Sequence, residues 1–258
     1  MSLTVTYTLM DPAKNLTVLV ETPVPAGERT AVAERLMARE PAAEQLGFLG
    51  DAPDADIGLT MAGGEFCGNA TLSAAVWQAK RSGLSEGCVT VCASGAPGPV
   101  PVDVAQQSDG SYIATLEMPT PLSVKKEPLP DGGELPVVRF DGISHVILEQ
   151  DLGKTAAEKL VKQWAAHWGE DALGLLLLDV KRNRLTPLVY VPAAGTLCWE
   201  RACGSGAAAV GAWLASERGE PIALQLQQPG GVLPIEASPG GPLRLSGPVR
   251  CLCRKTIQ

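Results

Sequence analysis

The feature that most constrains the fold of this chain is an internal repeat. The segments GGEFCGNATLSAAVWQAKRSG (63–83) and WERACGSGAAAVGAWLASERG (199–219) align without a gap, at a constant offset of 136 residues. The alignment pairs Cys67 with Cys203, and both copies end on a glycine. A repeat of this length indicates a duplicated domain, which would place the two halves of a site symmetrically. We therefore expect two domains of similar fold related by a pseudo-twofold axis.

Each copy of the repeat predicts one helix, over 70–82 and over 206–218. Alanine, serine and glycine occupy nearly every face of both segments, so neither helix has a broad polar side. This pattern favours helices surrounded by other structure over helices that lie on a surface. Gly83 and Gly219 stand where a helix commonly ends in the left-handed conformation.

Short β-type runs separated by glycine and proline fill most of the remaining chain, which has 28 Gly and 21 Pro. We expect strands near 4–8, 16–21, 57–61, 88–93, 100–104, 112–117, 144–149, 175–180, 186–191, 222–227, 232–237 and 243–247. Segments 29–39 and 155–168 predict two amphipathic outer helices, and the Pro-rich stretch 119–136 predicts a linker or a long surface loop.

The predicted architecture is α+β, with an N-terminal domain over 1–120 and a C-terminal domain over 121–247. We expect the last strand, 248–258, to rejoin the N-terminal domain. The chain has 258 residues, of which 45% are hydrophobic, enough to bury two cores of this size.

Composition excludes several function classes. The net charge is −7 without a basic tract, which argues against a nucleic-acid partner. Because we find neither a signal sequence nor a run of about 20 apolar residues, we expect a cytoplasmic protein without a membrane partner. Seven cysteines without framework spacing predict reduced thiols. The pairs Cys88/Cys92 and Cys251/Cys253 alternate as strands do, so we expect no metal site.

Each aligned cysteine directly precedes a predicted helix start, in Cys67-Gly68-Asn69 and Cys203-Gly204-Ser205. The first turn of a helix offers unbonded backbone N–H groups and the positive end of the macrodipole, which suit a carboxylate. The same field favours thiolate over thiol, so we expect a lowered pKa and a general base. A buried structural cysteine is the alternative for either motif alone. Two such cysteines in register favour inversion of an amino-acid Cα, which needs one proton removed from one face and another delivered to the opposite face.

At these residues the chain resembles the cofactor-independent two-cysteine racemases and epimerases of the diaminopimelate epimerase and proline racemase superfamily. Within that group it looks most like the histidine racemases of staphylopine-type metallophore biosynthesis. The resemblance extends over nearly the whole chain and includes Asn15 followed by LTVLV. Its other segments are AEQLGFLG (43–50), GGEFCGNATLS (63–73), WERACGSG (199–206) and QQPGGVL (227–233).

The resemblance implies a fold of two barrel-like domains, each wrapped around a central helix, with the active site in the cleft between them and no metal or pyridoxal phosphate. It implies that Cys67 and Cys203 are the catalytic acid/base pair. It also implies that Gly68, Asn69, Gly204 and Ser205 bind the α-carboxylate. Asn15 and Glu44 match family residues that face the substrate, and a carboxylate there suits a cationic or hydrogen-bonding side chain.

Two family elements are altered. Diaminopimelate epimerases carry Glu-Arg-Gly several residues before the second cysteine, whereas Glu200-Arg201 stands only three and two residues before Cys203. Their Asn-Pro-His element is Ile143-Ser144-His145 here, so only the histidine is retained. The sequence is compatible with either a substrate contact or a purely structural role for each of His145, Glu200 and Arg201.

Four functions are compatible with the sequence. The first is a racemase for histidine or another polar amino acid, and the second is a diaminopimelate epimerase. The third is a thiol hydrolase or acyl transferase with one cysteine nucleophile and His145 as base. The fourth is a binding module that keeps only the carboxylate clamp. The expected partner is a small-molecule amino-acid substrate, and a homodimer is one candidate assembly.

Overall fold

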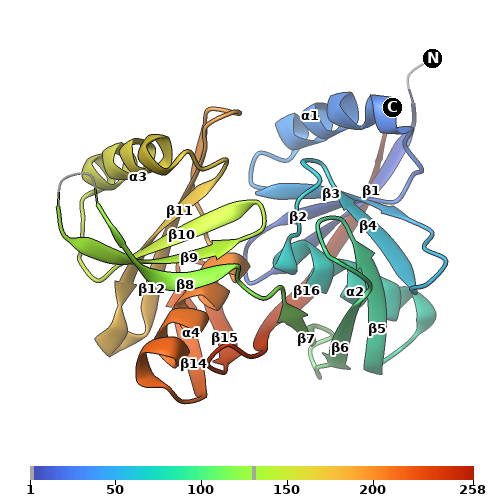
Figure 1. The fold of residues 1–258 in the computed structure, drawn as a ribbon. Helices are drawn as coiled ribbons and strands as arrows, with labels where there is room; N and C mark the ends of the chain where they lie inside the picture. The colour runs from blue at the N-terminus through green and yellow to red at the C-terminus, as the bar shows by residue number, and fades with distance from the viewer. Residues whose placement is uncertain (1–2, 130–131) are drawn as a thin grey trace. The chain divides into compact units, whose positions relative to one another are not determined.

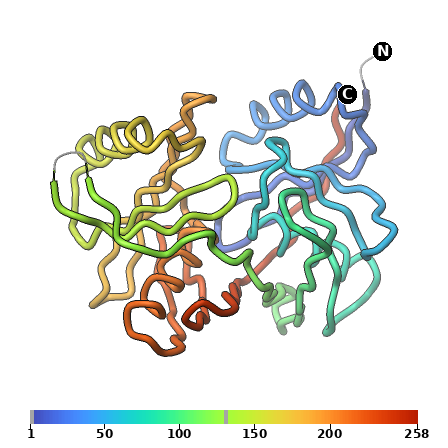
Figure 2. Tube along the Cα trace, in the orientation of Figure 1, coloured from blue at the N-terminus to red at the C-terminus, as the bar shows by residue number. Residues whose placement is uncertain are grey.

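The computed structural model describes residues 3–129 and 132–258, which divide into two compact units (Figures 1 and 2). Unit 1 contains the chain up to Glu117 together with Ser246–Gln258. Unit 2 contains Met118–Leu245. The division makes one long C-terminal strand a member of both units.

Unit 1 is an eight-stranded closed barrel. Its strands, in hydrogen-bonded order, are β1 (Val5–Pro12), β2 (Thr17–Val20), β3 (Gln45–Gly50), β4 (Ile57–Met61), β5 (Glu86–Ala93), β6 (Val100–Gln106), β7 (Tyr112–Met118) and β16 (Leu243–Ile257). Strand β16 pairs with β7 on one side and antiparallel with β1 on the other, which closes the barrel. The β2–β3 and β4–β5 pairs are parallel.

Helix α2 (Gly68–Ser82) is the central element of unit 1 and contacts the strands from β1 to β6. Ten of its residues are buried, on all faces, because small side chains allow strands to approach it closely. Helix α1 (Arg29–Arg39) follows the 3-10 turn Ala26–Glu28 and packs on β3. Its buried side chains, among them Leu36, join a cluster with Tyr7 and Phe48.

Unit 2 repeats this order of strands. In sequence along the sheet they are β8 (Ser123–Pro128), β9 (Glu134–Phe140), β10 (Ile143–Leu148), β11 (Leu173–Asp179), β12 (Arg184–Val191), β14 (Ile222–Gln228), β15 (Gly231–Ala237) and the start of β16, with β13 (Thr196–Trp199) paired to β12. The pairs β10–β11 and β12–β14 are parallel, as are their counterparts in unit 1.

The helices of unit 2 also repeat those of unit 1. Helix α4 (Gly204–Arg218) is buried along most of its length and contacts strands β8, β9, β10, β14 and β15. Helix α3 (Lys154–Trp168) packs on β11 and β12 from outside, and a 3-10 turn covers Val180–Arg182. These features confirm the predicted fold class, two pseudo-symmetric α+β units that each surround a helix.

The predicted helices form, with small shifts at their ends. Both central helices begin two residues earlier than expected, at the glycine that follows the cysteine. Gly83 and Gly219 end them with φ of 73° and 68°, so the predicted left-handed stops are confirmed. Strands β3, β8, β9 and β13 were not predicted.

The prediction of a linker or loop over 119–136 was wrong. The segment contains β8 and the start of β9, which pair antiparallel, although residues 130 and 131 lie outside the described residues. Lys125 and Lys126 lie on β8, the terminal strand of the sheet order, where charged residues and proline are tolerated. Within the described ranges, no helix combines the length and the apolar character that a membrane crossing requires.

Candidate functional site

Cys67 occupies the N-cap position of α2, with extended backbone angles (φ −129°, ψ 110°). Its carbonyl oxygen accepts the first intrahelical hydrogen bond, from the N–H of Thr71 at 2.9 Å. The N–H groups of Gly68 and Asn69 therefore point out of the helix start, where the macrodipole is positive. The Cys67 side chain is half-buried, so this sulfur is partly accessible.

A run of side-chain hydrogen bonds connects Cys67 to the turn between β1 and β2. The Cys67 Sγ donates to Gln45 Oε1 at 3.2 Å, and Gln45 Nε2 donates to Asn15 Oδ1 at 2.6 Å. Asn15 Nδ2 in turn donates to Glu44 Oε2 at 2.5 Å. The parallel β2–β3 pairing brings these residues together, because it sets Thr17 beside Gln45. Asn15 is buried, whereas Glu44 and Gln45 are half-buried.

Cys203 is the N-cap of α4 and has similar backbone angles (φ −104°, ψ 109°). Its side chain is much less accessible, since the residue is only 3% exposed. The Sγ accepts from the N–H of Gly206 at 3.3 Å and lies 3.5 Å from Ser205 Oγ. The Glu200 carboxylate is also hydrogen-bonded to this thiol.

The expectation that the helix start lowers the cysteine pKa was wrong for Cys203. Burial raises the pKa of its thiol well above the ordinary value, and the negative charge and hydrogen bond of Glu200 raise it further. Hydrogen bonds from Ser205 and Gly206 act in the opposite direction and are outweighed. The desolvation of a thiolate is therefore larger than the stabilisation that the helix terminus supplies. The buried Cys203 thiol is therefore protonated at neutral pH.

His145 lies on β10, and the structure brings it to Ser205, the second residue of α4. The distance from His145 Nε2 to Ser205 Oγ is 3.0 Å. The ring is fully buried, and desolvation lowers the pKa of His145 to about 3, so it is neutral. Within the described part of the chain, Nδ1 has no hydrogen-bond partner. Gly174 on β11 makes room for it, because a Cβ at that position would lie 2.1 Å from Nδ1.

The end of β14 and the turn that follows it fix the main chain in front of α4. The Gln228 side chain accepts from the Cys203 N–H at 2.7 Å and donates to the Cys203 carbonyl at 3.2 Å. The Gly230 N–H donates to the Arg201 carbonyl at 2.6 Å. Gln228 is buried and Arg201 is exposed. These contacts hold the Cys203 backbone from both sides.

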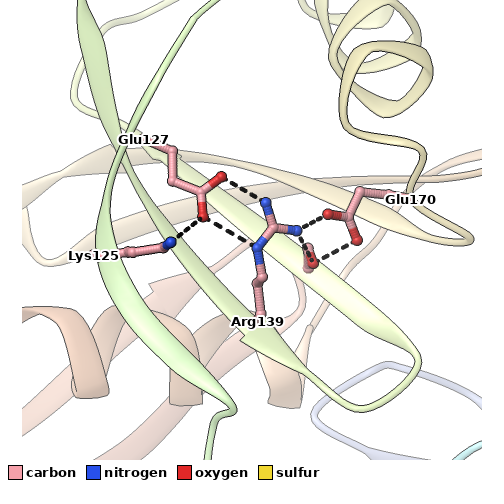
Figure 3. Close-up of polar contacts among 5 residues, drawn as sticks. Lys125, Glu127, Arg139 and Glu170 are labelled. Carbon is pink, nitrogen blue, oxygen red and sulfur yellow. Dashed lines mark hydrogen bonds and ion pairs between the residues drawn. The ribbon is translucent and has the colours of Figure 1, made fainter.

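A charged network that includes Glu127, Arg139 and Glu170 contacts β10 through Ser144 (Figure 3). Arg139 donates two hydrogen bonds to Glu127, at 2.6 and 3.2 Å, and pairs with Glu170. Ser144 accepts from Arg139 and donates to Glu170 at 2.7 Å. Lys125 lies 3.5 Å from Glu127. Because Ser144 and His145 are successive strand residues, the network fixes the strand that presents the histidine.

The predicted site residues thus fall into two groups, one in each unit. Unit 1 brings together Asn15, Glu44, Cys67, Gly68 and Asn69. Unit 2 brings together His145, Glu200, Cys203, Gly204 and Ser205. Arg201 lies beside this group, and its carbonyl oxygen accepts the hydrogen bond from Gly230.

Sequence reasoning missed two residues, Gln45 and Gln228. Each contacts a cysteine of the repeat, one through its sulfur and the other through its backbone. Both lie inside segments that carry the family resemblance, AEQLGFLG and QQPGGVL. A polar residue in an otherwise apolar or glycine-rich segment was the signal that could have found them.

Residues 4–241 of the chain match the family model described as the histidine racemase CntK N-terminal domain. The chain belongs to this histidine racemase family. A histidine racemase from Staphylococcus aureus (strain Mu50) is 28% identical over 242 residues, which cover 87% of this chain and 85% of the relative. One from Fusobacterium nucleatum is 31% identical over 216 residues, covering 80% and 78%. Membership of the histidine racemase family makes this chain a racemase, which is a kind of isomerase.

Solved structures share the fold. A probable proline racemase from Agrobacterium radiobacter matches with a TM-score of 0.71 over 98% of this chain and 93% of its own. The sequence identity of that pair is 14%. The fold is therefore shared with a protein of very different sequence.

Proposed function

We propose that this protein racemises histidine without a cofactor and that Cys67 and Cys203 are its two acid/base groups. The observation that carries the proposal is the equivalent position of the two sulfurs, each at the N-cap of the central helix of its unit. Inversion of Cα needs two proton-transfer groups, and two equivalent helix starts supply them. The names of the matched relatives support histidine as substrate.

In the proposed reaction, each proton that leaves one group is taken up by another. The Cys203 thiol first passes its proton to Glu200, which leaves a thiolate and a neutral carboxylic acid. The thiolate removes the Cα proton from one face, while the Cys67 thiol delivers its proton to the opposite face. The products are a Cys203 thiol, a Cys67 thiolate, a neutral Glu200 carboxylic acid and the inverted amino acid. Glu200 then releases its proton to solvent and the Cys67 thiolate takes one up, which restores the starting enzyme. The reverse reaction starts from the Cys67 thiolate, so neither direction consumes another reactant.

The helix starts supply the electrostatic part of catalysis. Negative charge builds on the α-carboxylate as the Cα proton leaves, and backbone N–H groups at a helix N-terminus stabilise it. We assign this role to Gly68, Asn69, Gly204 and Ser205. Neutral His145 holds the Ser205 hydroxyl in place. The Glu44 carboxylate, oriented by Asn15, is suited to accept a hydrogen bond from an imidazole N–H.

The test is proton NMR of L-amino acids incubated with the reduced enzyme in D2O. The panel includes histidine and diaminopimelate, and loss of the α-proton signal reports exchange. We expect exchange with histidine and a decrease of about 10²–10⁴-fold in each of Cys67→Ser and Cys203→Ser.

Two results would contradict the proposal. Exchange with diaminopimelate alone would replace the substrate, and full activity in either serine variant would exclude the two-thiol mechanism. Cys88→Ser is the matched control, because Cys88 is an exposed cysteine on β5.

A further inference from the structure

The hydrogen bonds behind Cys67 have a defined direction. An ionised carboxylate such as Glu44 accepts hydrogen bonds and cannot donate them. It therefore requires the NH2 group of Asn15 to face it, and the Asn15 Oδ1 must face away, towards Gln45. The observed contacts follow this order, from Asn15 Nδ2 to Glu44 and from Gln45 Nε2 to Asn15 Oδ1.

Thr17 fixes the Gln45 amide a second time. The Thr17 hydroxyl donates its proton to the Asn15 carbonyl at 3.2 Å, so its oxygen is available to accept. Gln45 Nε2 donates to that oxygen at 2.7 Å. A rotated Gln45 amide would turn its oxygen against Asn15 Oδ1 and lose the bond to Thr17. The amide oxygen of Gln45 is consequently left to face the sulfur of Cys67.

An amide oxygen beside a sulfur favours the protonated form of that sulfur. The thiol donates a hydrogen bond to Gln45 Oε1, whereas a thiolate would place negative charge next to the negative end of a carbonyl dipole. The α2 terminus acts in the opposite sense, because its positive end attracts a thiolate. Gln45 therefore opposes the helix start at the same atom.

We propose that Gln45 is a positioning residue that keeps the proton on Cys67 and directs the S–H bond, with its own direction imposed by Glu44 through Asn15. The inference rests on the proposed catalytic role of Cys67. It gives Glu44 an action on the sulfur that is separate from any contact with substrate. In the substrate-free enzyme, the proton donor is then the Cys67 thiol, which is held by its hydrogen bond to Gln45 Oε1.

The experiment measures the pH profile of Cys67 alkylation by iodoacetamide in the folded, reduced, substrate-free protein. Mass spectrometry of the Cys67 peptide quantifies the product, and only the thiolate reacts. Gln45→Met keeps the length of the side chain and removes the acceptor. We expect the pH midpoint to fall by about one unit. Gln106→Met, an exposed glutamine of β6, is the matched control and should leave the midpoint unchanged.

A double-mutant cycle tests the relay through Asn15. In Glu44→Gln the new amide can donate, so Asn15 and Gln45 can both rotate and present the Gln45 NH2 group to the sulfur. The midpoint should fall in this variant too. If the effect passes through Gln45, Glu44→Gln should move the midpoint by less than about 0.3 units in the Gln45→Met background.

Two outcomes would overturn the inference. An unchanged midpoint in Gln45→Met would show that the amide does not hold the proton. Equal shifts for Glu44→Gln in both backgrounds would show that its charge acts through space. The alkylation assay needs no turnover, so it is read independently of α-proton exchange. Exchange with an unshifted midpoint rejects this inference alone, whereas a shifted midpoint without exchange in the wild type rejects the proposed function.

Discussion

The two cysteines occupy equivalent positions in equivalent units, yet their surroundings differ. Cys67 is half-buried and donates to an amide oxygen, whereas Cys203 is almost fully buried and is hydrogen-bonded to a carboxylate. An amide cannot take a proton at neutral pH, but a carboxylate can. The two units therefore share the backbone conformation at the helix start but give each sulfur a different hydrogen-bond partner. The comparison teaches that an equivalent position in the fold does not give the two sulfurs the same hydrogen-bond partner or the same exposure to solvent.

The largest expected effect comes from making the second half-site resemble the first. Glu200→Gln replaces the carboxylate beside Cys203 by an amide and removes the group that accepts its proton. We expect kcat to fall by about 10²–10³-fold with little change in KM. Because Glu200 raises the pKa of Cys203, the proposed base, its replacement should also move the acidic limb of the pH–rate profile to lower pH. Steady-state rates measured across pH provide both readouts.

The control for this change is Glu217→Gln, which alters an exposed glutamate of α4 in the same unit. It should keep the wild-type rate. A Glu200→Gln enzyme with the same rate and pH profile as wild type would remove the proposed difference between the two half-sites.

A smaller effect is expected from Gly174→Ala, which tests the histidine that only unit 2 has. The added Cβ would lie 2.1 Å from His145 Nδ1, so the ring must move and its 3.0 Å contact with Ser205 is disturbed. Overpacking of this kind costs about 1–3 kcal/mol of unfolding free energy. We expect kcat to fall by about tenfold, because Ser205 loses its orientation. Urea unfolding and steady-state kinetics measure the two effects.

Gly98→Ala is the comparison variant, since a Cβ at that position meets nothing within 4 Å. It should be close to wild type in stability and rate. Wild-type kinetics in a folded Gly174→Ala protein would mean that the His145 contact has no part in the reaction.

The smallest effect concerns the charged network of unit 2. The hydrogen bonds of Arg139 hold the pKa of Glu127 below its ordinary value of 4.5, even though burial raises it. A lowered pKa in the folded state gives stability that is present above pH 4.5 and is lost as the pH falls through the folded value. Glu127→Gln should therefore lower Tm by about 2–4 °C at neutral pH, and the difference should vanish in acid.

Thermal unfolding across pH measures this difference. Glu134→Gln, an exposed glutamate on β9, should show no such pH-dependent difference. Unit 1 offers the counterpart, because bonds from Lys255 and Tyr7 lower the pKa of Glu40 against the effect of burial. A pH-independent loss in Glu127→Gln would assign the network a packing role instead.

Local patterns predicted a large part of this molecule. The cysteines, the central helices and their glycine stops were readable because the signals lie within a few residues of each other. Strand β3 was missed since Gly47 and Gly50 break its apolar pattern. At Gly47 a Cβ would lie 2.6 Å from Leu59 Cδ1, so a larger residue there would require the Leu59 side chain to shift.

The chemistry of the site was less predictable than its position. Gln45 lies near Cys67 because β3 pairs with β4, the strand that precedes α2, and Gln228 contacts Cys203 from the last position of β14. Neither pairing can be read from the spacing of the residues. The raised pKa of Cys203 depends on the balance between burial and the helix terminus, and the sequence shows only the second of these.

The shared strand β16 has a consequence for how the chain folds during synthesis. The barrel of unit 1 closes only when β16 pairs with β1. Val5, for example, pairs with Ile257, so this pair forms only after residue 257 has been synthesised. Chains grow at about 5–20 residues per second, which leaves the edges of β1 and β7 uncovered for many seconds. Unit 2 is continuous in sequence and has no such delay. We expect unit 2 to fold first on the ribosome, with unit 1 completed only after β16 has emerged.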